Sequence, residues 1–282
     1  DDFWGFEMLQ HVMVCNLNSC PDIHTKTQRK TLLPLRVKLK IKMQDKHWIS
    51  RTTALIGDEK LTKLNKSHVL VVGLGGIGSF AAEFIARSGV GKMTIVDGDV
   101  VDPTNRNRQL PAMSSTHGVS KADWMAARIK DINPEIELNV VKEFLSPKKA
   151  YEIVSLYDYD YIIDAIDSIT PKINLLKAAY DLKKKIVMSG GAGGKMDPTK
   201  LTVDDLANTY NCVFVKMVRK RLKKEKIYTG IPVVFSTELP DRNSLILTDG
   251  KNYKKSAYGT ISYLPAAFGG VCASVVIRDL IK

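Results

Sequence analysis

The strongest constraint on this chain is a glycine-rich turn that directly follows an apolar segment. Residues 68–72 are apolar and rich in β-branched side chains, which predicts a buried strand. Gly73, Gly75 and Gly78 come next in the spacing GxGxxG, with Gly76 among them. A turn of this kind lets backbone N–H groups approach a phosphate at the N-terminus of the following helix. The sequence therefore predicts a phosphate-binding turn in an α/β fold.

The segment after the turn completes a strand–turn–helix–strand unit. Residues 79–87 have a helical pattern that Gly89 ends, and residues 93–96 form a second apolar strand that stops at Asp97. An acid at this position can accept hydrogen bonds from ribose hydroxyls, as in dehydrogenases that bind a nicotinamide dinucleotide. The glycine spacing alone suits such a dehydrogenase equally well.

A polar, cationic cluster past the second strand favours a polyphosphate instead. Its members are Asn105, Arg106, Asn107, Arg108 and Gln109. In open α/β sheets ligands bind outside the carboxyl ends of the strands, which is where this cluster is predicted to lie. Two arginines there suit a ligand with more negative charge than one helix dipole can offset. The alternative is a solvated loop that is basic by chance.

Composition narrows the possible partners and compartments. The 282 residues carry a formal net charge of +12, which indicates a polyanionic partner such as nucleic acid or, alternatively, a solvated basic surface. No run of 18 apolar residues occurs, so the sequence predicts no membrane span. The four cysteines form no CxxC pair, which is typical of a reduced cytoplasmic protein.

Apolar segments alternate with helical patterns along the rest of the chain. Strands are predicted over 137–141, 159–165, 186–188 and 231–235, and helices over 119–132, 171–183 and 268–281. This alternation predicts the α/β class, with a Rossmann-like, mostly parallel sheet flanked by helices and a C-terminal α/β extension. Residues 208–226 are a strongly basic helical pattern, which is either a solvated face or a surface for nucleic-acid phosphates.

Six motifs together resemble one family of adenylating enzymes. They are GLGGIGS at 73–79, NRNRQ at 105–109, DAIDS at 164–168, GGAGGKMDPT at 190–199, VFSTE at 234–238 and the closing GTISYLPAAFGGVCASVVIRDL. The pattern is similar to the superfamily of ubiquitin-activating enzymes and molybdopterin-synthase adenylyltransferases. Within it, the GGAGG and VFSTE segments resemble the tRNA threonylcarbamoyladenosine dehydratases.

The resemblance implies ATP and Mg²⁺ as cofactors and assigns their ligands. The nucleotide positions it implies are Gly73, Gly75, Gly76, Gly78, Asp97, Asn105, Arg108, Lys121 and Asp167. The magnesium carboxylate matches Asp167, whereas Asp164 is interpreted as a strand-end or capping acid. The implied catalytic residues are Arg108, Lys121 and Arg51. An arginine at position 51 reaches into the partner's nucleotide site in the superfamily, which implies a homodimer; a plain surface arginine is the alternative.

The implied reaction begins with transfer of AMP to the threonyl carboxylate of threonylcarbamoyladenosine in the tRNA anticodon loop. The neighbouring carbamoyl group then closes a ring, with net loss of water, so no catalytic cysteine is needed. The alternative is an adenylyltransferase that activates the C-terminus of a ubiquitin-like or sulfur-carrier protein, for which the missing CxxC pairs and the basic charge are unfavourable. A nicotinamide-binding dehydrogenase would leave the arginine cluster and Lys121 without a role.

The resemblance covers residues 48–282, which we expect to form one adenylating domain. Residues 1–47 stand apart and contain seven lysines and arginines between positions 26 and 42, with no acid from residue 24 to 43. They are either a basic arm for RNA or sequence upstream of a true start at Met43, and we favour the second interpretation.

Overall fold

The computed structural model describes residues 48–247 and 256–282, and the prediction for residues 1–47 lies outside them. The helices are α2 (Ser50–Ile56), α3 (Asp58–Lys66), α4 (Gly78–Arg87), α5 (Lys121–Ile132), α6 (Pro147–Ser155), α7 (Ile169–Asp181), α8 (Val213–Lys224) and α9 (Tyr263–Leu280). The strands are β1 (His68–Val72), β2 (Lys92–Val96), β3 (Glu137–Val141), β4 (Tyr161–Asp164), β5 (Ile186–Ser189), β6 (Leu201–Asp205), β7 (Pro232–Ser236), β8 (Leu245–Leu247) and β9 (Ser256–Tyr258). Short 3-10 turns include η2 (Pro103–Asn105) and η5 (Leu206–Asn208).

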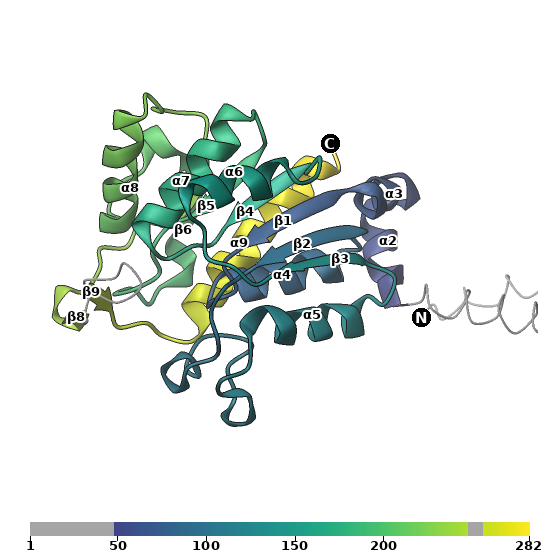
Figure 1. Cartoon of the computed structure of the whole chain (residues 1–282), viewed down its shortest axis with the longest axis horizontal. Coiled ribbons are helices and arrows are strands. Elements are labelled where there is room, and N and C mark those ends of the chain that lie inside the picture. The colour runs from purple at the N-terminus through teal and green to yellow at the C-terminus, as the bar shows by residue number, and fades with distance from the viewer. Residues whose placement is uncertain (1–47, 248–255) are drawn as a thin grey trace, which may run out of the picture. The chain divides into compact units, whose positions relative to one another are not determined.

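Seven strands form one sheet in the order β3-β2-β1-β4-β5-β7-β6, in which only β6 is antiparallel to its neighbour (Figure 1). The chain order reverses direction between β1 and β4, which is the topological switch point where α/β sheets bind ligands. Strands β8 and β9 pair separately. The mostly parallel α/β sheet predicted from the sequence is confirmed.

The strand register places the predicted site residues at one level of the sheet. Val72, the last residue of β1, lies opposite Val96 on one side and Asp164 on the other. The backbone N–H of Gly73 donates to the carbonyl of Val96 at 2.8 Å, and that of Ala165 donates to the carbonyl of Val72 at 2.9 Å. The segments that leave β2, β1 and β4 therefore start side by side at the same edge.

Two apolar layers hold the sheet, one on each face. Along β1, Val69 and Val71 face the core made with α4, α5 and α9, whereas Leu70 and Val72 face the core made with α6, α7 and α8. All these side chains are buried, which is why this strand reads as a continuous apolar run. Each such side chain contributes about 1.5–3 kcal/mol through burial. Figure 1 shows α6, α7 and α8 grouped on one face.

The C-terminal helix α9 packs closely against α4. A Cβ added to Gly269 would lie 2.5 Å from the carbonyl oxygen of Ile77 and 3.0 Å from the Cβ of Phe80, so only glycine permits this approach. Among the described helices, α9 is the one whose length and composition would suffice to cross a membrane, and 39% of it is buried inside the protein. Its buried face, which includes Phe268 and Val276, forms part of the core.

The sequence missed some elements and misplaced others. Helix α6 and the antiparallel strand β6 were not predicted, although Ser146 caps α6 and Pro147 occupies its first position. The final helix begins at Tyr263, five residues before its predicted start. Val119, the first residue of the helix predicted over 119–132, precedes α5 and is exposed.

Candidate active site

The glycine turn after β1 is formed by residues with different steric roles. Gly73 has φ of +87°, and a Cβ there would lie 2.9 Å from the carbonyl oxygen of Ala165. A Cβ on Gly78 would lie 1.7 Å from the carbonyl oxygen of Gly73. At Gly75, by contrast, the nearest atom to an added Cβ is 3.7 Å away, in the side chain of Gln109. The protein itself therefore requires glycine at 73 and 78, while the space beside Gly75 is open to ordinary contact.

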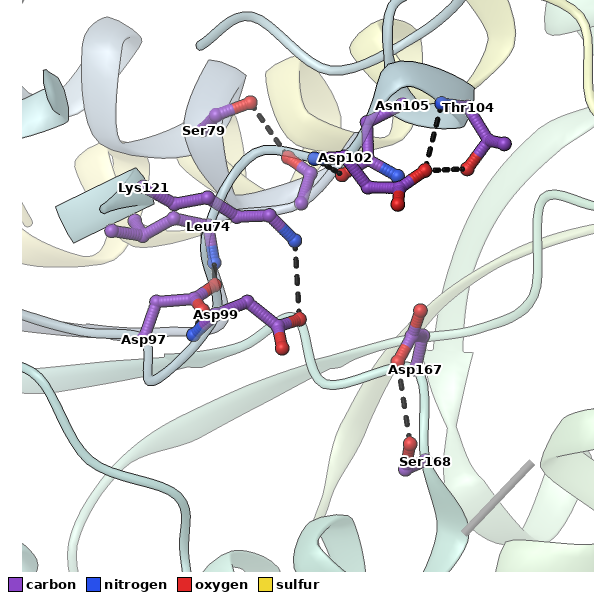
Figure 2. Close-up of polar contacts among 11 residues, drawn as sticks. Leu74, Ser79, Asp97, Asp99, Asp102, Thr104, Asn105, Lys121, Asp167 and Ser168 are labelled. Carbon is purple, nitrogen blue, oxygen red and sulfur yellow. Dashed lines mark hydrogen bonds and ion pairs between the residues drawn. The ribbon is translucent and has the colours of Figure 1, made fainter. Parts of the chain in front are cut away.

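Asp97, at the end of β2, is fixed against this turn (Figure 2). Its Oδ2 accepts the backbone N–H of Leu74 at 2.6 Å, and its Oδ1 accepts that of Asp99 at 2.7 Å. Burial raises the pKa of the Asp97 carboxyl, an effect that the nearby Lys121 and the two backbone N–H groups oppose. A carboxylate has about four acceptor sites, so about two remain for other hydrogen-bond donors.

Lys121 is buried at the first position of α5, and its ammonium faces the same edge (Figure 2). The Nζ atom lies 3.1 Å from Oδ2 of Asp99, a side chain that is 42% exposed. A cation at a helix N-terminus is unfavourable by about 0.3–1 kcal/mol, and the Asp99 carboxylate offsets this. Asp99 is the second acid of the Asp-Gly-Asp segment that begins at Asp97, and its pairing with Lys121 was not predicted from the sequence.

The cationic cluster is built on the short turn η2. The Asp102 side chain accepts the N–H of Thr104 at 2.8 Å, and Oδ1 of the buried Asn105 accepts the N–H of Asp102 at 3.2 Å. Arg108 is half-buried, and its Nη1 donates to the carbonyl of Thr104 at 3.0 Å and to Oδ1 of Asn107 at 2.8 Å. The capped turn holds Asn105 and Arg108 in place. It lies close to the glycine turn, since a Cβ added to Gly76 would lie 3.3 Å from the carbonyl oxygen of Arg108.

Asp164, the last residue of β4, and Asp167, in the loop that follows, occupy different environments. Asp164 is fully buried, and its Oδ2 pairs with Nζ of the equally buried Lys172 at 2.7 Å. Its Oδ1 accepts the N–H of Ile166 at 3.1 Å, so this carboxylate has a structural role, in keeping with the strand-end interpretation. Asp167 is exposed in the loop after β4, where the Ser168 hydroxyl donates to its Oδ1 at 3.4 Å (Figure 2).

The different environments of Asp164 and Asp167 decide which carboxylate suits the predicted magnesium ion. Within residues 48–247 and 256–282, no three His, Cys, Asp or Glu side chains cluster as a metal site. Mg²⁺ bound with a nucleotide needs only one or two carboxylates, because phosphates and water supply the other ligands. The exposed carboxylate of Asp167 fits that donor set, whereas Asp164 is already neutralised by Lys172.

A second glycine-rich segment, residues 190–194, leaves the carboxyl end of β5. Gly190 donates its N–H to the carbonyl of Val234 at 2.7 Å. Lys195 is buried and donates to the carbonyl of Ser236 at 3.1 Å, and the Glu238 carboxylate accepts the N–H groups of Met196 and Asp197. This segment and the end of β7 line the same sheet edge as the turn after β1, on the far side of β4.

Arg51 and two cysteines are the remaining residues to place. Arg51 lies on α2 and is exposed, and no hydrogen bond or ion pair in the described part of the chain links it to the glycine turn. Cys212 and Cys272 are both buried free thiols, and burial raises the pKa of Cys272 to about 12.

These features define a class of α/β protein with a glycine-rich turn at a topological switch point and a carboxylate and cations along the same sheet edge, an arrangement typical of nucleotide-binding proteins. The model of the ThiF family matches residues 49–282. The chain belongs to the ThiF family and, within it, groups with the tRNA threonylcarbamoyladenosine dehydratases.

Three relatives illustrate this placement. The tRNA threonylcarbamoyladenosine dehydratase of Bacillus subtilis is 42% identical over 84% of this chain and 95% of its own length. The Escherichia coli enzyme of the same name is 37% identical over 81% of this chain and 91% of its own length. Dehydratase 2 of Saccharomyces cerevisiae is 34% identical over 77% of this chain, which spans 49% of that relative.

Solved structures agree with the sequence comparison. The crystal structure of the E. coli tRNA N6-threonylcarbamoyladenosine dehydratase in complex with ATP has a TM-score of 0.74 and 37% sequence identity, covering 82% of this chain and 93% of that one. The same enzyme in complex with AMP gives the same values.

Proposed function

We propose that this protein catalyses the ATP-dependent dehydration of threonylcarbamoyladenosine in tRNA, through adenylation of the threonyl carboxylate. One observation carries the proposal. The glycine turn, Asp97, the cluster on η2 and Lys121 lie along one edge of the sheet, beside its switch point, in a chain 42% identical to a dehydratase of that name.

Adenylation requires charge neutralisation along the triphosphate and accurate positioning of the carboxylate. The backbone N–H groups of the turn that contains Gly75 would bind phosphate oxygens at the start of α4. Asp97 would accept the ribose hydroxyls, and Asn105 and Arg108 would bind near the α-phosphate. Lys121 would exchange its ion pair with the half-exposed Asp99 for a phosphate, because a polyphosphate carries more negative charge.

Neither step needs a protein nucleophile. In the first step the threonyl carboxylate attacks the α-phosphate of ATP, and pyrophosphate leaves. The carbamoyl group of the same nucleoside then attacks the activated acyl carbon, AMP departs with one former carboxylate oxygen, and an N–H proton is released. The net change is the loss of one water from the nucleoside. The burial of both described cysteines supports this intramolecular path over a thioester.

We further propose three features of the working enzyme. Mg²⁺ would be held by Asp167 and would neutralise phosphate charge when bound. The active unit would be a homodimer in which Arg51, exposed on α2, reaches the partner's nucleotide. The reaction would take place in the cytoplasm, which suits the free thiols of Cys212 and Cys272.

Release of AMP tests the proposal directly. The protein is incubated with ATP, Mg²⁺ and tRNA that either carries or lacks the threonylcarbamoyl group, and AMP is quantified. We expect AMP to form only with the modified tRNA. AMP formation that instead depends on the C-terminus of a carrier protein would replace the proposal with the adenylyltransferase alternative.

A further inference from the structure

The outer face of α8 presents a row of lysines that the nucleotide site does not use. Lys216, Lys220, Lys223 and Lys224 are exposed and fall within about 100° of the helix circumference, opposite the buried Val215, Val218 and Leu222. We call these four lysines the basic α8 face. Figure 1 shows α8 at the outside of the helical layer, beside α7.

The two arginines of α8 differ from these lysines, because both arginines form hydrogen bonds within the protein. Nη1 of Arg219 donates to the carbonyl of Thr209 at 2.6 Å and to its Oγ1 at 2.9 Å, so this arginine fixes the segment before α8. Arg221 donates to Oγ1 of Thr170 at 3.2 Å. No lysine of the basic α8 face forms an ion pair with a described carboxylate, and Glu225 faces Lys177 instead, at 3.9 Å.

Helix electrostatics explain only part of this row. Cations in the last turn of a helix are stabilised by its dipole by about 0.3–1 kcal/mol each, which accounts for Lys223 and Lys224. Lys216 and Lys220 lie before the last turn, and Lys216 is only the fourth residue of the helix. Because the two are four positions apart with like charge, they repel each other. An external anion would remove this cost.

The basic α8 face also begins near the sheet edge, beside the glycine-rich segment after β5. Cys212 directly precedes α8, and its Sγ lies 3.9 Å from a Cβ added to Gly191, in the glycine-rich segment after β5. From there α8 leads away along the outer layer. An RNA strand with one nucleoside at the sheet edge would therefore place its neighbouring phosphates over the basic α8 face.

We propose that the basic α8 face binds the phosphate backbone of the tRNA substrate while the modified nucleoside occupies the sheet edge. This rests on the proposed function, since the partner is the tRNA of that reaction. Contacts of this kind position RNA without reading its sequence. They make the affinity depend on salt, because each neutralised phosphate releases counterions.

The test compares two double variants that remove the same charge from exposed helical lysines. Lys216→Gln/Lys220→Gln alters the basic α8 face, and Lys60→Gln/Lys66→Gln alters α3, where both lysines are exposed. Glutamine keeps a similar helix propensity, so both variants should fold. The dissociation constant of tRNA carrying threonylcarbamoyladenosine is measured across about 50–200 mM salt, together with ATP affinity and denaturant midpoint.

Two lost phosphate contacts should reduce the slope of log affinity against log salt by about 1.4–1.8. That corresponds to a weakening of about 25- to 60-fold at 0.1 M salt, with ATP affinity and the turnover number at saturating tRNA unchanged. The α3 variant should stay within about twofold of the wild type. An α8 variant that matches the α3 variant in slope and affinity would overturn the proposal. Failure of wild-type protein to dehydrate bound tRNA would instead overturn the proposed function, because binding is measured without turnover.

Discussion

Substitution of two glycines in the same turn by alanine separates their structural and ligand-facing roles. In Gly78→Ala, the new methyl group would lie 1.7 Å from the carbonyl oxygen of Gly73 and 2.9 Å from the Cβ of Ala165. Real Cβ contacts do not fall below 3.0 Å, so the start of α4 and the turn must separate by about 1.3 Å. Such overpacking typically lowers the free energy of unfolding by about 1–3 kcal/mol. The higher helix propensity of alanine, which is worth at most about 1 kcal/mol, offsets only part of this loss.

The displacement should also impair catalysis. A 1 Å misplacement of reacting groups costs about 100-fold in rate, so AMP release by the folded variant should fall by at least that factor. Gly75→Ala is the matched control, because its methyl group would come no closer than 3.7 Å to any protein atom. This variant should unfold at the same denaturant concentration as the wild type. Its only defect should be a weaker affinity for ATP, because the methyl group occupies space that a phosphate would use. Wild-type stability and AMP release in Gly78→Ala would refute this account of the turn.

Three further predictions follow from the same structure. Lys172→Met leaves the buried Asp164 carboxylate unpaired and should lower the free energy of unfolding, measured in urea, by about 3–5 kcal/mol. Adding Asp164→Asn should restore part of this loss. Equal stability of the wild type and both variants would contradict the role of the ion pair. Arg108→Ala and Asp167→Ala should abolish AMP release while the protein stays folded, and normal turnover in either would refute its assignment. Because burial raises the pKa of Cys272 to about 12, native protein at pH 8 should resist iodoacetamide at this thiol until urea unfolds it, as read by peptide mass.

The sequence predicted the parts of the site that depend on local pattern. The strand before Gly73, the position of Asp97 at a strand end and the helix that starts near Lys121 all follow from apolar periodicity and turn residues. Because parallel strands share one carboxyl edge, these local features were enough to place the site residues along that edge.

The sequence could not predict which charged groups pair through space. A lysine in an amphipathic helix is normally solvated, and nothing local marks Lys172 as fully buried against Asp164. The ion pair of Lys121 with Asp99 depends on the distance between α5 and the segment after β2. Likewise, the basic run in α8 did not reveal that Arg219 is bound internally to Thr209, whereas the four lysines of the basic α8 face form no ion pair with any carboxylate that the structure describes.

The most direct test of the central claim is the mass of the modified nucleoside. Protein, ATP, Mg²⁺ and tRNA carrying threonylcarbamoyladenosine are incubated, and the tRNA is digested under mild conditions that preserve a cyclic product. The account predicts that the nucleoside loses the mass of one water, in a reaction that requires ATP. An unchanged nucleoside, with tRNA bound and ATP present, would contradict it.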